Sequence, residues 1–152
     1  MQFNIEDVKK LREETGAGIL DVKQALENAL GDYEKARKEL MDKVSSKAAK
    51  KSDRTANDGL VYSYIHATGK VGSMLLMGCE TDFVAKTEDF KRTCHEVALQ
   101  ICTSDYKDIE ELYEAEYIKD SSKKVRDIIN EVTAKTGEKV EVKKFIKYVI
   151  GE

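Results

Sequence analysis

The chain has 152 residues, a formal net charge of -3, 41% hydrophobic residues and 36% charged residues. Its length allows a hydrophobic core without disulfides or metals, and its composition excludes a disordered chain. The net charge argues against a general binder of nucleic acid or membrane surfaces, so we expect neither contact. No apolar run approaches the roughly 18 residues of a membrane span, and the first residues do not resemble a secretory signal. Three widely spaced cysteines fit a reducing compartment, so we expect a cytoplasmic protein.

Helical periodicity dominates the first third of the chain. Asn4 and Asp32 are favourable N-caps, and the two glycines of residues 15–18 interrupt the pattern between the first two helices. The expected buried positions are Ile5, Val8 and Leu11, then Leu20, Ala25, Leu26 and Ala29, then Tyr33, Ala36, Leu40 and Val44. Residues 45–58 are basic and almost without large apolar side chains, which predicts a linker helix. We therefore expect residues 1–53 to form an N-terminal three-helix domain with a basic linker helix.

The remaining residues, 54–152, predict an α+β core domain. Strands are expected at residues 60–67, 71–79 and 140–150, and helices at residues 87–102, 104–116 and 122–137. The second strand is apolar on both faces, so it should be central. Thr87 can cap the first of these helices, whose apolar stripe is Phe90, Cys94, Val97, Ala98 and Ile101. The predicted fold class is α+β, with the three-helix domain followed by a three-stranded antiparallel sheet covered by helices.

The stretch Cys79 to Lys86 reads Cys-Glu-Thr-Asp-Phe-Val-Ala-Lys and joins an apolar strand to a charged, helix-prone segment. A strand-to-helix passage here places Asp82 and Phe83 at an exposed junction. An aromatic ring beside a carboxylate suits insertion into a partner protein. The alternative interpretation is that Phe83 is a core ring that anchors the following helix.

Several other kinds of site have little support in the sequence. His66, His95 and the three cysteines lack the spacing of a metal site, and cysteines on apolar stripes are usually inert core residues. Residues 15–18 lack the Gly-x-x-x-x-Gly-Lys pattern of a phosphate-binding loop, which favours a simple turn. Glu80 and Asp82 could act as an acid–base pair, but carboxylates so placed are most often solvated or capping groups.

Several ordered segments together resemble the translation elongation factor Ts family. The Cys79–Ala85 stretch resembles the most diagnostic motif of that family, and the match extends over most of the chain. The other matching segments are Val8–Arg12, Thr15–Gly18, Asp21, Lys23, Ala25 and Leu26, Gly31, Asp32 and Ala36, Lys47–Lys51, Arg54, Ala56 and Asp58–Leu60, and Phe145 with Gly151 and Glu152. The first segments resemble the ubiquitin-associated-like three-helix domain of the family.

The resemblance implies a guanine-nucleotide exchange factor that binds elongation factor Tu in its GDP form and speeds GDP release. It implies a partner-binding tip at Thr81, Asp82, Phe83 and Val84, whose Asp-Phe pair disrupts the magnesium and phosphate site. It also implies docking through Lys23 and Lys51 in the N-terminal domain. Such a factor makes and breaks no covalent bond, so we expect neither an enzyme nor a cofactor or metal of its own.

The chain departs from longer members of the family, which have a second core subdomain and a coiled-coil insertion. Here the acidic residues 104–116 run almost directly into Tyr117–Asp120, which resemble the region after those insertions. Short members with one core subdomain form homodimers, so a homodimer is expected. The rival hypothesis is a non-exchanging interaction adaptor with a ubiquitin-associated-like head, and a small hydrolase that uses Glu80 and Asp82 is a distant third.

Overall fold

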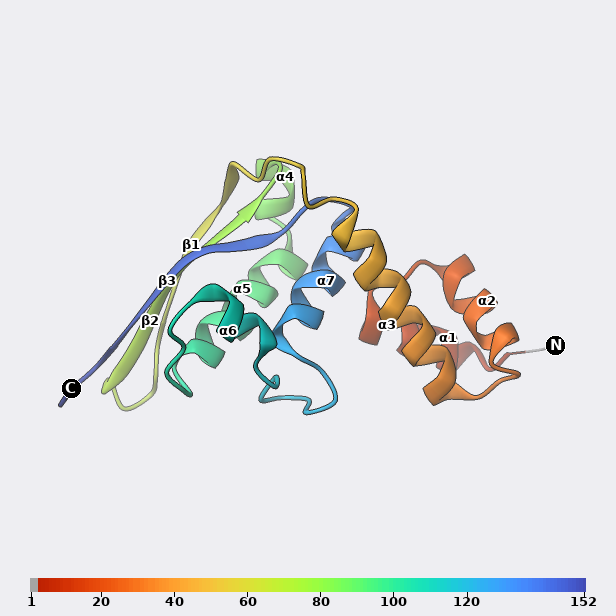
Figure 1. Cartoon of the computed structure of the whole chain (residues 1–152), viewed down its shortest axis with the longest axis horizontal. Helices are drawn as coiled ribbons and strands as arrows, with labels where there is room; N and C mark the ends of the chain where they lie inside the picture. Colours follow the sequence, from red (N-terminus) through yellow and green to blue (C-terminus); the bar gives the residue numbers. More distant parts are fainter. Residues whose placement is uncertain (1–2) are drawn as a thin grey trace.

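The computed structural model describes residues 3–152, and it contains seven helices and three strands within that range (Figure 1). The elements are α1 (Ile5–Thr15), α2 (Ile19–Asn28), α3 (Tyr33–Ala49), β1 (Asp58–Ile65), β2 (Val71–Cys79), α4 (Asp82–Ala85), α5 (Glu88–Ile101), α6 (Ile109–Glu114), α7 (Val125–Thr136) and β3 (Glu141–Val149). The α+β fold class is confirmed. None of the helices in residues 3–152 is both long and apolar enough to cross a membrane.

Helices α1, α2 and α3, called the head below, surround their own hydrophobic cluster. The Asn4 side chain accepts a hydrogen bond from Glu6 N, and Asp32 caps α3 by accepting one from Lys35 N. The buried members of the cluster are Val8, Leu11, Ala17, Val22, Ala25, Leu26, Ala36, Leu40 and Val44. The expectation that Leu20 is buried is wrong, because its side chain is 78% exposed, and Ile5 is exposed as well.

The basic segment after the head is less helical than expected. Helix α3 ends at Ala49, and residues 50–54 continue in turns before the chain becomes extended toward β1. Ala56 is buried there. The prediction of a linker helix over residues 45–58 is therefore correct only for its first residues.

The sheet has the strand order β1-β2-β3, with both pairs antiparallel, so the central position of β2 is confirmed. Helix α5 lies against one face of the sheet, α6 adjoins β3 and α7 packs on α5 and α6, and Figure 1 shows no element against the other face. Leu75, Met77 and Cys79 of β2 are buried on the covered face. All five predicted stripe residues of α5 join them, so the helices cover one face of the sheet only.

The bare face of the sheet is largely apolar, and we call it the outer sheet face. The register pairs Val61 with Leu76, Met74 with Ser63 and Ile146, and Gly72 with Ile65 and Tyr148. Its exposed members are Val61, Ser63, Ile65, Met74, Leu76, Lys144, Ile146 and Tyr148. A soluble domain rarely exposes so many large apolar side chains in one contiguous area, so this face is a candidate contact surface.

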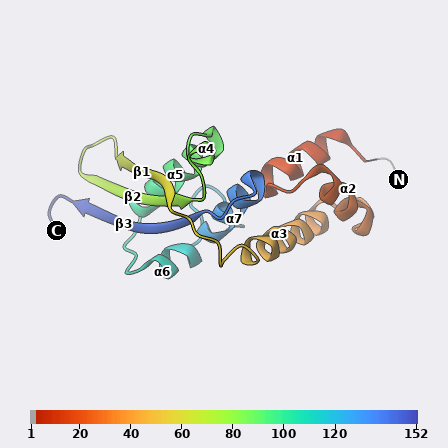
Figure 2. The ribbon, with the colours of Figure 1, turned by 90° about the horizontal axis from the view of Figure 1, so that it is seen from above.

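The head and the sheet lie at opposite ends of the molecule, and α3 adjoins α7 between them (Figures 1 and 2). The loop after α1 approaches α7 closely at Gly16. This residue has a φ of 75°, and an added Cβ would lie 2.5 Å from the backbone oxygen of Glu131. Glycine is thus required here for both its backbone angle and its lack of a side chain.

Candidate functional site

The junction after β2 forms a short projecting turn. Cys79 ends the strand, Thr81 is the N-cap of the four-residue helix α4, and its Oγ1 accepts a hydrogen bond from Val84 N at 3.3 Å. Val84 and Ala85 point into the hydrophobic core beneath the turn. Of the four tip residues, Val84 is thus an anchor, whereas Thr81 is half-buried at the base.

Asp82 and Phe83 are the two residues that the turn presents to solvent. The Phe83 side chain is 80% exposed, which rules out the alternative of a core ring. The Asp82 carboxylate is exposed as well, and it lies 3.3 Å from the exposed ammonium of Lys86. An unsupported aromatic side chain on a fixed turn leaves apolar surface that a partner protein can bury.

Glu80 does not form a working pair with Asp82. Its carboxylate accepts a hydrogen bond from Lys139 N at 2.6 Å and lies 3.4 Å from Arg54 Nη1, whereas the Asp82 carboxylate faces Lys86. A backbone-bound carboxylate with a cationic neighbour has a structural role. The geometry therefore gives no support to an acid–base site at this junction.

Both histidines have a hydrogen-bonding partner, and Cys79 and Cys94 are buried free thiols. Burial raises the pKa of the Cys79 thiol to about 11 and that of the Cys94 thiol to about 12, so neither is a thiolate nucleophile near neutral pH. His66 and His95 each share a hydrogen bond with a tyrosine, Tyr64 and Tyr62 respectively. Within residues 3–152, no three potential metal ligands lie close enough to hold an ion.

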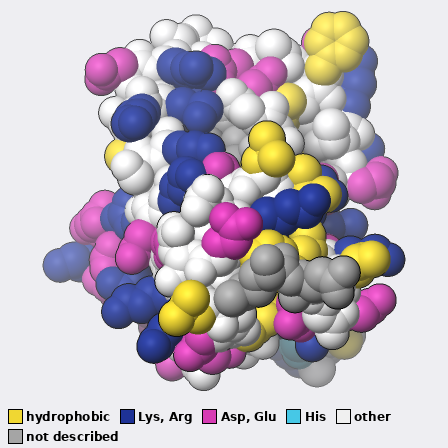
Figure 3. All heavy atoms as spheres, turned by 90° about the vertical axis from the view of Figure 1, so that its right-hand side faces the viewer, with side chains coloured by type: hydrophobic (Ala, Val, Ile, Leu, Met, Phe, Trp, Pro, Cys, Tyr) yellow, Lys and Arg dark blue, Asp and Glu magenta, His cyan; other side chains and the backbone are white. Residues whose placement is uncertain are grey.

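The head presents a second candidate surface along α2 and the end of α3. Lys23 is exposed on α2, and Lys51 is half-buried just after α3, where it lines a hollow with Gly18 and Asp21. Ile19 and Leu20 expose apolar side chains at the start of α2. Figure 3 views the molecule from the end at which the head lies, where hydrophobic side chains are exposed beside Lys and Arg side chains.

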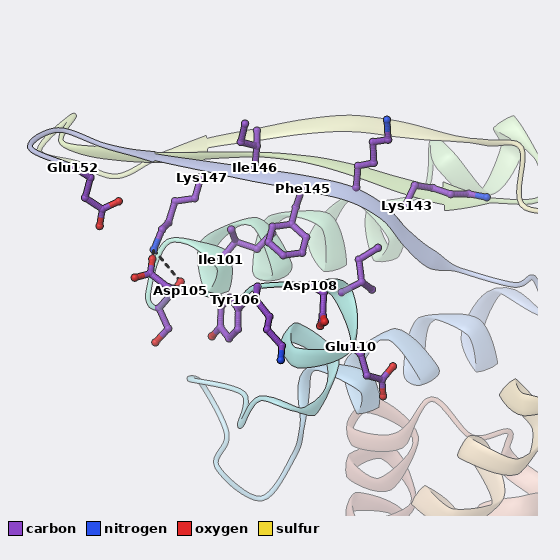
Figure 4. A pocket seen from close by; sticks show the side chains of 14 residues that line it. Ile101, Asp105, Tyr106, Asp108, Glu110, Lys143, Phe145, Ile146, Lys147 and Glu152 are labelled. Atoms are coloured by element: carbon purple, nitrogen blue, oxygen red, sulfur yellow. Dashed lines mark hydrogen bonds and ion pairs between the residues drawn. The ribbon is translucent and has the colours of Figure 1, made fainter.

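A broad groove lies between β3 and the loop that connects α5 to α6 (Figure 4). Its volume is about 910 Å³, and Phe145, Ile101 and Tyr106 form its apolar part. Four of its charged side chains already have partners, because Lys147 is paired with Asp105, Glu110 with Arg126, and Lys143 with Glu141. The groove is thus an open surface with paired charges and has no resemblance to a catalytic cleft.

Comparison with known proteins supplies the family. A family model described as Elongation factor TS matches residues 80–152, a range that begins at the base of the tip. Elongation factor Ts of Thermotoga sp. (strain RQ2) is 39% identical over 195 aligned positions, which cover 100% of this chain and 98% of the relative. The chain belongs to the elongation factor Ts family. Relatives from Petrotoga mobilis, at 39% identity over 100% of both chains, and Moorella thermoacetica, at 38% over 96% of this chain and 94% of the relative, agree.

This member of the elongation factor Ts family is shorter than these relatives. Because it contributes 152 residues to 195 positions aligned with the Thermotoga protein, at least 43 of those positions have no residue in this chain. The shortening agrees with the interpretation of the sequence as a member with one core subdomain.

Sequence reasoning missed Leu20 as an exposed residue, and it missed every contact that holds the tip from a distance. The helical period could have identified Leu20, since it lies opposite the stripe of Val22, Ala25 and Leu26. Nothing local marks Glu138, which contacts the base of the tip from 57 residues away in the sequence.

Proposed function

We propose that the protein is a guanine-nucleotide exchange factor that binds elongation factor Tu in its GDP form and promotes GDP release. The observation that carries this proposal is the exposed Phe83 on a fixed turn, in a chain of the elongation factor Ts family. Translation takes place in the cytoplasm, so we place its action there. The activity breaks no covalent bond, so the protein acts as a binding partner and not as an enzyme.

The mechanism follows from the linkage between two binding equilibria. Magnesium is the largest local charge where a GTPase holds a diphosphate, so disturbing its position weakens nucleotide binding. Phe83 acts as a wedge beside that site, and Asp82 places a negative charge close to it. A protein that binds the disrupted conformation must lower nucleotide affinity, and nucleotide must lower the affinity for the protein by the same factor.

We propose that the head docks on the GTPase domain of elongation factor Tu. Lys23 and Lys51 supply positive charge, and the exposed Ile19 and Leu20 supply apolar contact area beside them. A mixed surface of this kind suits a protein interface, in which charges guide encounter and apolar groups provide most of the affinity. In this arrangement residues 1–53 form the docking domain and residues 54–152 form the core domain that carries the tip.

We further propose that two copies of the chain associate through the outer sheet face. Lys144 is the only charged residue among its eight exposed members, so a second identical face meets it with little charge repulsion. A homodimer buries apolar groups that are otherwise exposed to water.

The experiment that tests the exchange proposal measures release of fluorescent GDP from elongation factor Tu with and without the protein. Acceleration supports exchange, and binding without acceleration supports the rival, a non-exchanging adaptor with a ubiquitin-associated-like head. Absence of both binding and acceleration contradicts the proposed partner.

A further inference from the structure

The base of the tip is held by a carboxylate from a distant part of the chain. Glu138 Oε1 accepts hydrogen bonds from the backbone N–H groups of Glu80 and Thr81, at 3.1 and 3.0 Å. Glu138 Oε2 accepts a third from the Thr81 hydroxyl at 2.7 Å. Three donors thus converge on one side chain, and hydrogen bonds to an ionised acceptor are the stronger kind.

A second carboxylate completes this contact in the opposite direction. Glu80 Oε2 accepts a hydrogen bond from the backbone N–H of Lys139, the residue after Glu138, at 2.6 Å. Glu138 in turn accepts hydrogen bonds from the backbone N–H groups of Glu80 and Thr81. The strand end and the turn between α7 and β3 therefore hold each other through two crossed contacts. We call these the crossed carboxylate contacts.

The position of Glu138 is itself fixed by the end of α7. Gly137 ends this helix with a φ of 75°, a left-handed conformation that glycine adopts without steric cost. Glu138 N then donates to Thr136 Oγ1 at 3.3 Å. The side chain that holds the tip thus follows directly after α7, the helix of the core that packs against α3 of the head.

Glu138 also determines which way the Thr81 hydroxyl points. The hydroxyl proton is donated to Glu138 Oε2, which leaves an oxygen lone pair to accept the hydrogen bond from Val84 N. A helix of four residues has too few internal hydrogen bonds to hold itself, so its N-cap decides its direction. The chain of contacts from Glu138 through Thr81 to Val84 spans Asp82 and Phe83.

We propose that Glu138 is a positioning residue for nucleotide exchange, which sets the direction in which the Asp82–Phe83 pair projects. This inference rests on the proposed exchange function. Glu138 lies at the base of the tip and acts through Thr81, so its removal misdirects Phe83 without deleting any group that meets the partner. The head surface, which provides docking, is unaffected.

The test measures GDP release from elongation factor Tu as a function of the concentration of the full-length protein, for the unaltered protein, Glu138→Ala and Glu138→Gln. In Glu138→Ala the rate at saturation falls at least about tenfold, because a misdirected Phe83 side chain is no longer held in the position that disrupts the nucleotide site. The concentration for half-maximal rate changes less than about threefold, since docking is intact. Glu138→Gln retains a carbonyl oxygen for the two N–H groups and recovers part of the lost rate.

A second readout follows the tip without elongation factor Tu. Amide hydrogen exchange at Val84 and Ala85, whose N–H groups donate to Thr81 Oγ1 and to the Thr81 backbone oxygen, becomes at least about tenfold faster in Glu138→Ala, as expected for a locally loosened segment. Val132→Ala is the matched control, since it creates a cavity in the core on α7 and leaves the crossed carboxylate contacts in place. Val132→Ala lowers the thermal midpoint but leaves the saturating rate of GDP release and the hydrogen-exchange rates of the tip amides unchanged.

The outcomes separate the two proposals. Unchanged hydrogen-exchange rates of the tip amides in Glu138→Ala overturn the positioning role. The same conclusion follows if Val132→Ala, at an equal fall in thermal midpoint, loses as much of the saturating rate of GDP release as Glu138→Ala does. If the unaltered protein does not accelerate GDP release but Glu138→Ala loosens the tip, the exchange function is wrong and the structural role of Glu138 stands. Acceleration with an unchanged rate in Glu138→Ala supports exchange and overturns the positioning role.

Discussion

The ammonium group of Lys123 donates a hydrogen bond to the backbone oxygen of Glu14 at 2.6 Å, and so joins the core to the last turn of α1. Lys123 also forms an ion pair with Glu131 of α7, and the side chains are only 8% and 16% exposed. Arg37 of α3 adds a second link, to Glu14 at 3.1 Å and to Ser122 at 3.0 Å. These contacts fix the position of the head relative to the tip. Docking of the head on a partner protein therefore also determines where the tip meets that partner.

The first prediction concerns the Lys123–Glu131 ion pair. Lys123→Met keeps the side-chain length but leaves Glu131 buried without its cation, which costs about 3 kcal/mol in the free energy of unfolding. Equilibrium unfolding in urea measures this difference. Lys119→Met is the control, because Lys119 pairs with Glu96 at 2.6 Å but is half-exposed, so its loss should cost less than about 1 kcal/mol. Equal effects of the two substitutions contradict the structural role given to Lys123.

The second prediction concerns how the loss of stability in Lys123→Met depends on pH. Burial raises the pKa of the Glu131 carboxyl above its ordinary value of 4.5, and Lys123 opposes this increase. A carboxyl with a raised folded-state pKa favours folding below its unfolded pKa, and this contribution is lost as the pH rises through the folded pKa. Lys123→Met raises the pKa of the Glu131 carboxyl further. The difference in the free energy of unfolding between the unaltered protein and Lys123→Met should therefore narrow as the pH falls from 7 toward about 4.5. Urea unfolding at several pH values tests this, and a constant gap contradicts it.

The third prediction concerns the close approach of Gly16 to α7. Gly16→Ala places a Cβ 2.5 Å from Glu131 O at a φ of 75°, so it should cost about 1–3 kcal/mol in the free energy of unfolding. Gly69→Ala is a matched control, since its φ is 71° and no atom lies within 4 Å of the added Cβ. The difference between the two thermal midpoints isolates the steric effect. An equal fall in the thermal midpoint of Gly16→Ala and Gly69→Ala means that the head does not contact α7 closely at this point.

The sequence predicts those parts of the fold that depend on local periodicity. The buried stripe of α5 and the central position of β2 are confirmed, because apolar spacing alone specifies a buried face. Leu20 was placed in the core although it lies about 160° around α2 from Val22, at 100° per residue.

The contacts that fix the tip and the head could not be predicted, because they join residues far apart in the chain. Glu138 is 57 residues from Thr81, and Lys123 is 109 residues from Glu14. A single Glu or Lys in a polar segment carries no local sign of such a partner. The exposure of Phe83 was also open from the pattern alone, because an aromatic residue at a strand-to-helix junction fits both a core and a surface position.

The fourth prediction tests the homodimer. Met74 lies in the middle strand of the outer sheet face, paired with Ser63 and Ile146. Met74→Glu places a charge on each copy at the proposed interface, so light scattering at micromolar concentration should show one chain where the unaltered protein shows two. Leu30→Glu, at an exposed position of the head, should leave the dimer intact. A monomeric unaltered protein contradicts the proposed dimer directly.

The fifth prediction concerns Phe83 itself. Its side chain is 80% exposed, so Phe83→Ala should change the free energy of unfolding by no more than about 0.5 kcal/mol. The rate of GDP release from elongation factor Tu should nevertheless fall at least about tenfold, because an aromatic anchor at an interface is commonly worth about 2 kcal/mol. Ile118→Ala is the control, as it shortens another exposed apolar side chain away from the tip and should leave the rate unchanged. An unchanged rate of GDP release in Phe83→Ala contradicts the proposed role of Phe83 as a wedge but not the exchange function. An equal loss of rate in Phe83→Ala and Ile118→Ala indicates a general effect of surface hydrophobicity.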